Sequence, residues 1–318
     1  MATVVSITNP ITGAVEQVDK LDHTAQQIDD AVSIAPQLSN RNLLDNWYFA
    51  NPVNQRGQTS YIGAGYGIDR WKSSNSNLSV NLTGDGIVLS SGSAAGYLAQ
   101  YFDGGIPIED SYTISALVEA ITGTAYFQAI YSDGTYGKAM KLAAGLNVLT
   151  VKAAKTISRV LFQINAGSSV TIKAAKLELG SQQTLAHQDA DGNLVLNEIP
   201  DYGEQLRRCQ RYSKVYGSIP PNFGQPFFCA GFYRVDSGFV QLTMICPEFR
   251  EIPVVSILDG DWALFDGENV YNIGEINLVA YMPGVATLRI TSPGNSFSNG
   301  KILFLFANSG KIMLSADL

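Results

Sequence analysis

The chain has 318 residues and a net charge of −7, and only 15% of its residues are charged, against about 25% in an average soluble domain. An acidic chain has no global positive field, so we do not expect nucleic-acid binding. No apolar run reaches the ~18 residues of a membrane helix, and the start MATVVSITNPITG lacks the basic and apolar regions of a secretory signal. We therefore expect neither membrane insertion nor export.

The cysteines predict no metal centre and no disulfide framework. Cys209, Cys229 and Cys246 lack the C-x-x-C spacing of a zinc site, and an odd number cannot close a full set of disulfides. We interpret them as small buried apolar residues of a protein made in a reducing cytoplasm. No metal and no cofactor are expected.

Residues 16–38 follow a helical pattern. Their apolar residues recur at alternating spacings of three and four, which is typical of a coiled-coil seam, and Pro36 ends the pattern. We assign residues 1–40 to an N-terminal segment for oligomerisation or attachment, which contains a short, coiled-coil-like α-helix. Its seam positions are Val18, Leu21, Ala25, Ile28, Val32 and Ala35. So narrow a seam buries little by itself, and two alternatives stay open: self-association, or packing against its own chain.

From Asn42 onward the apolar period changes to two. Runs such as YTISALVEA and NVLTVKA are separated by turn signals such as TGDG and SDGTYG. Many short strands without intervening helices indicate an antiparallel, jelly-roll-like β-sandwich. We assign residues 41–186 to one sandwich and residues 213–318, where the same pattern returns, to a second. The predicted fold class is mainly β.

The segment 187–212 is expected to join the two sandwiches as a hairpin followed by a linker helix. The hairpin turn is predicted at Asp191-Gly192-Asn193. The acids of DADGNLVLNE imitate a calcium loop, but the glycine and the last acid stand at the wrong positions for one. An ordinary turn is therefore favoured over a metal site.

The linker helix carries Arg207, Arg208 and Arg211 in a chain that is poor in charge. A catalytic role would need a base nearby, and the two histidines, His23 and His187, belong to other segments. Arginine forks bond carboxylates in a bidentate manner, which suits a domain junction. Anion binding stays open as the alternative.

Two stretches resemble a family of bacteriophage and prophage tail-fibre proteins. NLLDNWYFANPVNQRG, followed by YGIDRWK, is similar to the opening of a β-sandwich module found in them. Leu177, Glu178, Leu179, Gly180 and Ser181 are similar to its closing segment, and residues 202–212, YGEQLRRCQRY, to the motif that comes next. Here the segment between these two motifs is longer than in the family, and Gln205 replaces a glutamate.

The resemblance implies a carbohydrate-binding first sandwich, a homotrimer, and contacts with other phage tail proteins. The hypothesis is a non-catalytic receptor-binding protein of the virion tail, made in the bacterial cytoplasm, that attaches the virion to a bacterial surface glycan. The alternatives are a structural tail or baseplate component that contacts only virion proteins, and a glycan depolymerase.

Candidate glycan contacts are aromatic residues in turn-rich segments, because loops carry binding more often than the strands that hold them. They are Trp262, Phe265 and Tyr271 with Asp261 in LDGDWALFDGENVY, and Tyr61 and Tyr66 in SYIGAGYGID. The alternative for Trp262 is a buried ring inside a polar turn. Trp47 and Trp71 are predicted to be core.

Overall fold

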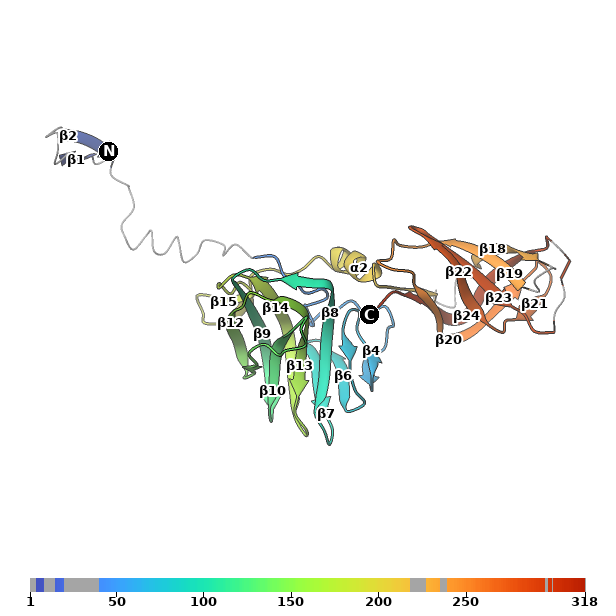
Figure 1. Cartoon of the computed structure of the whole chain (residues 1–318), viewed down its shortest axis with the longest axis horizontal. Coiled ribbons are helices and arrows are strands. Elements are labelled where there is room, and N and C mark those ends of the chain that lie inside the picture. The colour runs from blue at the N-terminus through green and yellow to red at the C-terminus, as the bar shows by residue number, and fades with distance from the viewer. Residues whose placement is uncertain are drawn as a thin grey trace. The chain divides into compact units, whose positions relative to one another are not determined.

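The computed structural model describes residues 4–8, 15–19, 40–217, 227–234, 239–294, 297–298 and 300–317 (Figure 1). The chain divides into two compact units, Met1–Ser39 and Asn40–Leu318. The second unit contains two large hydrophobic cores. We call the parts around them the first module (residues 40–186) and the second module (residues 213–317).

The first unit contains an antiparallel hairpin of β1 (Val4–Thr8) and β2 (Val15–Asp19), in which Val5 pairs with Val18. The predicted helix is therefore wrong for residues 16–19. Valines are stiff at χ1 and suit a pleated strand better than a helix, and both strands are rich in them. The other seam positions, Leu21, Ala25, Ile28, Val32 and Ala35, lie outside the described residues.

The first module is a sandwich of two six-stranded antiparallel sheets, as predicted. One sheet has the strand order β11-β10-β13-β8-β5-β4 and the other has the order β12-β9-β14-β7-β6-β3. The strands are β3 (Ser60–Ile62), β4 (Gly65–Tyr66), β5 (Lys72–Ser73), β6 (Leu78–Thr83), β7 (Gly86–Ser91), β8 (Gly96–Pro107), β9 (Ser111–Thr122), β10 (Ala125–Tyr131), β11 (Met140–Lys141), β12 (Gly145–Lys152), β13 (Thr156–Ile164) and β14 (Ser169–Leu179).

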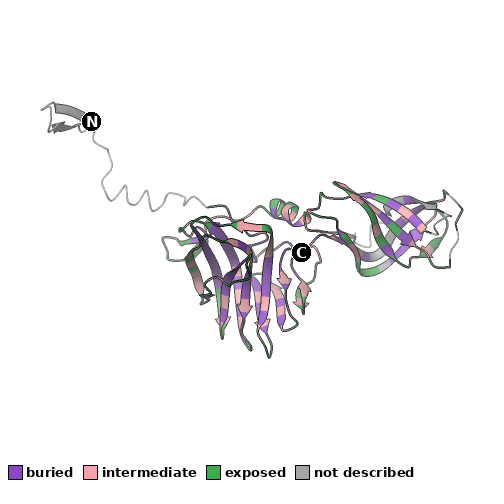
Figure 2. Cartoon of the chain, in the orientation of Figure 1, coloured by how far each residue is buried: buried purple, intermediate pink, exposed green. Residues whose placement is uncertain are grey.

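Aromatic rings fill the centre of this sandwich. Phe127 and Phe162 stack with their centroids 4.2 Å apart, and Trp71 lies 5.7 Å from Phe162. Trp47 and Trp71 are 2% and 0% exposed, so both belong to the core as predicted. Buried and more exposed residues alternate along β6 and the first part of β14 (Figure 2), as expected when one face of a sheet packs against another sheet. Most residues of β9 and β10 are buried without alternation.

Polar bonds fix the segment that opens the first module. The Asn46 side chain donates to the carbonyls of Val53 (2.9 Å) and Asp69 (2.8 Å) and accepts from the Val53 amide (2.7 Å). The Trp71 indole donates to the Asn46 carbonyl at 3.0 Å. Asn46 also adopts a positive φ of 51°, which asparagine tolerates better than most residues. Asn46 and Trp71, which belong to the motif that opens the first module, therefore have structural roles.

A hairpin and a helix connect the modules, as expected. The hairpin consists of β15 (Ala186–Gln188) and β16 (Leu194–Leu196). Helix α2 (Tyr202–Gln210) begins after Asp201, whose side chain accepts from the Glu204 amide at 2.7 Å. It buries Gln205 and Cys209. Across the described ranges, no helix has the length and apolar character needed to cross a bilayer.

The second module is one eight-stranded antiparallel sheet, so the prediction of two packed sheets is wrong here. Its strands are β17 (Ser213–Gly217), β18 (Phe227–Arg234), β19 (Phe239–Ile245), β20 (Val254–Phe265), β21 (Val270–Asn272), β22 (Ile276–Met282), β23 (Val285–Thr291) and β24 (Ile302–Ser315). β20 pairs along most of β24, while β17 and β18 pair with separate parts of β24's other edge. Two bulges interrupt the β20–β24 ladder, and bulges bend and twist strands. One bent sheet can therefore surround a core without a second sheet.

Candidate functional site

One sheet of the first module presents a row of aromatic and polar side chains on its outer surface. Leu98, Phe127 and Phe162 point into the core, so their neighbours along β8, β10 and β13 point outward. We call this surface the tyrosine face. It consists of Tyr66, Tyr97, Tyr101, Tyr126, Gln128, Gln163, Arg159 and Lys72, around a floor of Ala99, Ile130 and Leu161.

Strand register sets the spacing of the tyrosine face. Tyr126 on β10 pairs with Gln163 on β13, and Gln163 pairs with Tyr97 on β8. Two strand spacings separate the tyrosines by about 10 Å. All three side chains are partly exposed. Two aromatic rings with an amide between them therefore form a row that is suited to an extended ligand.

Two cationic side chains lie at the other end of the tyrosine face. The Arg159 guanidinium lies 5.3 Å and the Lys72 ammonium 5.9 Å from the centroid of the Tyr101 ring. Lys72 also lies 5.3 Å from the Tyr66 ring. Cation–π contacts of this length restrain both partners. This part of the face therefore offers positioned donors beside aromatic rings.

The structure brings the two predicted residues Tyr61 and Tyr66 together. Both line a cavity of about 100 Å³ together with Leu98 and Val80. Burial raises the pKa of both phenols, so each is a neutral hydroxyl at neutral pH. The Tyr61 hydroxyl donates to Asn54. Tyr66 belongs to the tyrosine face by register, whereas Tyr61 lies on the neighbouring sheet.

The other predicted group of glycan contacts, in residues 258–271, is placed differently from Tyr61 and Tyr66. Trp262 is 6% exposed and packs in the core of the second module. Its expected role as an exposed anchor is therefore corrected: the bent β20 turns the indole inward, where its Nε1 lies against the backbone at Gly310. Phe265 ends β20 and is partly exposed. Asp261 lies in β20, and its side chain is outside the described part of the chain.

Tyr271 is partly exposed, but its hydroxyl and its ring both contact neighbouring side chains. Its hydroxyl donates to the Asp266 carboxylate at 2.8 Å, and its ring packs edge-on against Phe297 at 4.7 Å. Lys301 also pairs with Asp266 at 3.0 Å. Hydrogen bonds from the backbone amides of Asn269 and Glu268 lower the pKa of Asp266, so the carboxylate stays ionised and holds Tyr271. The arrangement is that of a stabilised turn.

The three predicted junction arginines have different partners. Arg208 pairs with Asp45 of the first module at 2.6 Å, whereas Arg207 pairs with Glu204 on its own helix. No carboxylate of the described residues lies within ion-pair distance of Arg211. Among the described residues, Arg208 is therefore the one of the three that forms an ion pair outside its own helix.

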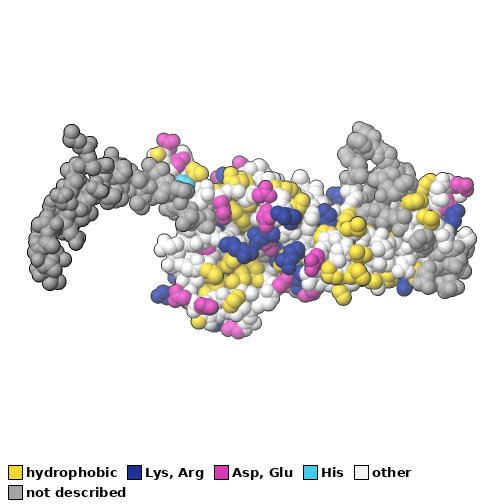
Figure 3. Space-filling view, turned by 90° about the horizontal axis from the view of Figure 1, so that it is seen from above, with side chains coloured by type: hydrophobic (Ala, Val, Ile, Leu, Met, Phe, Trp, Pro, Cys, Tyr) yellow, Lys and Arg dark blue, Asp and Glu magenta, His cyan; other side chains and the backbone are white. Residues whose placement is uncertain are grey.

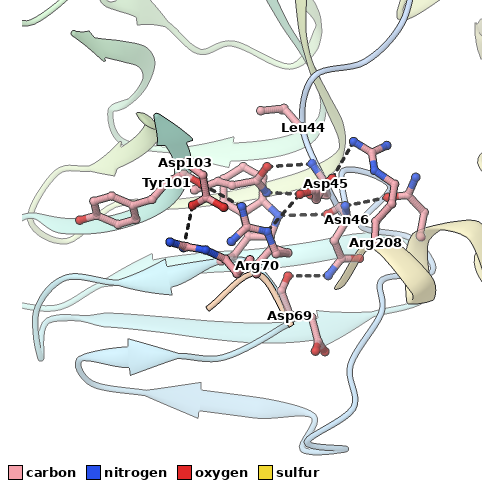
Figure 4. Close-up of polar contacts among 12 residues, drawn as sticks. Leu44, Asp45, Asn46, Asp69, Arg70, Tyr101, Asp103 and Arg208 are labelled. Carbon is pink, nitrogen blue, oxygen red and sulfur yellow. Dashed lines mark hydrogen bonds and ion pairs between the residues drawn. The ribbon is translucent and has the colours of Figure 1, made fainter. Parts of the chain in front are cut away.

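Two further arginines, which the sequence did not single out, contact segments other than their own. The Arg70 guanidinium bonds Asp45 at 3.0 Å and the Tyr101 carbonyl at 2.8 Å, and stacks 3.3 Å from the centroid of the Tyr212 ring (Figure 4). Arg250 of the second module pairs with Asp103 of the first at 2.6 Å. The contacts Arg70–Tyr212 and Arg250–Asp103 join residues more than 100 positions apart, which no local pattern reveals.

Apart from Tyr66, the residues of the tyrosine face were not predicted either, although a signal for them exists. Tyr97 and Tyr101 stand four residues apart in YLAQYF, so both fall on the same side of a strand. The sequence does not say which side faces the core. In the described ranges, no three His, Cys, Asp or Glu side chains gather as metal ligands would.

Comparison with known proteins finds similar solved structures but no matching sequence or family. No protein-family model matches the chain, and no curated sequence matches it. Among solved structures, a mutant family 29 carbohydrate-binding module has a TM-score of 0.28 and 11% identity, covering 37% of this chain and 86% of that one. The C-terminal CBM6 of LamC, a marine laminarinase from Zobellia galactanivorans, has a TM-score of 0.25 and 14% identity, over 33% and 90% of the two chains. CBM1 of BiXyn10A has a TM-score of 0.31 and 13% identity, over 44% and 100%. At these TM-scores the likenesses carry no argument, so the function has to be inferred from the geometry of this chain.

Proposed function

We propose that this protein binds a glycan without cleaving it, through the tyrosine face of its first module. The observation that carries the proposal is the row Tyr126–Gln163–Tyr97 across three neighbouring strands. Aromatic rings offer rigid, amphipathic contact area at a small cost in conformational entropy. The amide between them can both donate to and accept from sugar hydroxyls. A flat chain of several sugar rings matches such a row.

The composition of the face favours binding over hydrolysis. Glycoside cleavage uses two carboxylates on either side of the scissile bond. The tyrosine face contains amides, phenols and the cations Arg159 and Lys72, and the rows that define it contain no Asp or Glu. This supports a non-catalytic role over a depolymerase.

The proposed setting is the tail of a bacteriophage, where the protein would attach the virion to a bacterial surface glycan. The support is the resemblance of residues 42–72 and 177–212 to tail-fibre motifs. A virion protein of this kind is made in the bacterial cytoplasm and contacts other tail proteins. A homotrimer would join weak sites into avid binding, because the second contact forms at high effective concentration.

The second module supports self-association. Ile245 on β19 is 86% exposed and Met282 on β22 is 63% exposed. Both pair with Val285 on the intervening strand β23, so they lie in one row across the sheet. A contiguous exposed apolar row suits a contact with a second copy of the chain. The heptad pattern of residues 21–35 is the other candidate for holding the assembly.

Titration against a panel of purified bacterial surface polysaccharides tests the glycan proposal. Tyr97→Ala and Tyr126→Ala should each weaken binding about 30-fold, a loss of ~2 kcal/mol, because each removes one aromatic anchor. Tyr202→Ala is the matched control, since Tyr202 is an exposed tyrosine on α2, outside the face. It should bind like the wild type.

Other results would favour the competing functions. If the folded wild type binds no polysaccharide of the panel but is retained by purified virion tails, the protein is a structural component. Released oligosaccharides in the same reactions would identify a depolymerase. Equal binding by the wild type and both tyrosine variants would move the glycan site away from this face.

Sedimentation of two double variants tests the assembly. Ile245→Glu with Met282→Glu puts two charges in the apolar row of the second module, and should reduce the oligomer mass if that row is an interface. Leu21→Asp with Ile28→Asp tests the N-terminal seam in the same way. A wild type that sediments as a monomer would overturn self-association altogether.

A further inference from the structure

Four arginines from two separate segments surround adjoining cavities. Arg41 comes from the start of the first module, and Arg207, Arg208 and Arg211 come from the end of α2 and the residue after it. All four line a cavity of about 470 Å³. Arg41, Arg208 and Arg211 also line a second cavity of about 290 Å³. Figure 3 shows Lys and Arg side chains gathered near the middle of the described surface.

The carboxylates nearby do not neutralise this cluster. Glu204 pairs with Arg207, and Asp45 is shared between Arg208 and the buried Arg70. The third carboxylate in the linings, Asp103, is already paired with Arg250. Within the described part of the chain, Arg41 and Arg211 therefore have no acidic partner. This is unexpected in a chain that carries more acids than bases.

A buried donor lines the smaller cavity as well. Arg70 is 2% exposed, and its Nη1 has no hydrogen-bond partner among the described residues. The rest of its guanidinium is fixed by Asp45, the Tyr101 carbonyl and the Tyr212 ring (Figure 4). Buried polar atoms normally find a partner. Nη1 is accordingly a fixed donor of a cavity-lining residue that could serve a further acceptor.

The helix dipole explains only part of the cluster. Cations near a helix C-terminus are favourable, and Arg207, Arg208 and Arg211 lie there. Arg41 belongs to a different segment and gains nothing from that position. Arg207 and Arg211 are also spaced i, i+4, at which like charges repel. A bound anion accounts for the positions of all four.

We propose that this arginine pocket binds a phosphate group. Guanidinium forks bond phosphate oxygens in a bidentate manner, and several forks around one site suit a doubly charged group better than a single carboxylate. The cavities have room for a small phosphate ester as well as for the free ion. The inference stands independently of glycan binding, because none of the residues that line the two cavities belongs to the tyrosine face.

Calorimetric titration of the full chain with inorganic phosphate at fixed ionic strength tests the proposal. Glycerol phosphate and acetate serve as separate arms, one for a phosphate ester and one for a carboxylate. The wild type should bind both phosphate compounds at least tenfold more tightly than acetate. Arg41→Gln with Arg211→Gln should weaken phosphate binding at least tenfold, and because both side chains are exposed the variant should fold normally.

Two controls separate this site from general charge and from the tyrosine face. Arg289→Gln removes an exposed arginine of the second module and should leave phosphate binding unchanged. Tyr97→Ala should also leave it unchanged. The proposal is overturned if the wild type binds no phosphate, if the double variant binds it equally well, or if acetate binds as tightly as phosphate.

Discussion

The two modules of this chain use similar strands to build different cores and surfaces. The first closes two sheets over stacked aromatic rings and a buried polar network around Asn46 and Asp69. The second bends a single sheet around a mainly aliphatic core and leaves large apolar side chains such as Ile245 and Ile252 exposed. The difference is consistent with the proposed roles, in which the first module binds a glycan and the second contacts other copies of the chain.

The largest effect should come from the aromatic centre of the first module. Phe162→Ala removes a fully buried ring that stacks on Phe127. It should lower the free energy of unfolding of this module by about 4 kcal/mol. Hydrogen exchange of peptides from β10 and β13 would report the loss, with peptides from β19 and β23 as the internal reference. Equal loss in both sets would show that the modules unfold as one unit.

Trp262→Ala is the corresponding change in the second module. Removing the buried indole should cost about 3 kcal/mol there and should leave glycan binding by the tyrosine face intact. Exchange in β20 and β24 measures the first effect, and polysaccharide titration the second. A variant that is as stable as the wild type but fails to bind glycan would restore Trp262 as a contact residue.

Acid should act in opposite directions in the two modules. Burial raises the pKa of Asp69 in the first module, although Gln55 donates two hydrogen bonds to it. Its contribution to stability is therefore fully present below the unfolded value of about 4 and is lost as the pH rises through the folded pKa. Backbone hydrogen bonds lower the pKa of Asp266, so its contribution is present above about pH 4 and is lost as the pH falls through the folded pKa.

Melting temperatures of Asp69→Asn and Asp266→Asn between about pH 3 and about pH 7 check these signs. The destabilisation caused by Asp69→Asn should shrink as the pH rises. The destabilisation caused by Asp266→Asn should grow over the same range. Parallel pH profiles for the two variants would contradict the assignment.

The smallest expected effect concerns calcium at the hairpin between the modules. The Asp189 carboxylate accepts from the amides of Asp191 and Asn193 and from the Asn193 side chain. These bonds already occupy it within a turn, so millimolar calcium should not raise the melting temperature. A calcium site filled at one hundred times its dissociation constant would add about 2.7 kcal/mol. A clear rise that disappears in Asp189→Ala would therefore show a metal site.

Local patterns predicted much of the fold but little of the site. The alternating runs predicted the strands of both modules, because this period follows from backbone geometry. The valines of residues 15–18 fit a helical seam and a strand equally well as a pattern, and the structure pairs them in a hairpin. A short apolar run leaves that choice to tertiary contacts.

By itself, the sequence determined the mainly β class, the turns, the linker helix and the core positions of Trp47 and Trp71. Only the tertiary structure decided which side of β8 meets solvent, and so that Tyr97 and Tyr101 share a surface with Tyr126. It also decided that Trp262 is buried and that Arg41 stands beside the arginines of α2. The periodicity of a segment shows how apolar and polar residues alternate along it. The contacts named here depend instead on strand register and on bonds between distant segments.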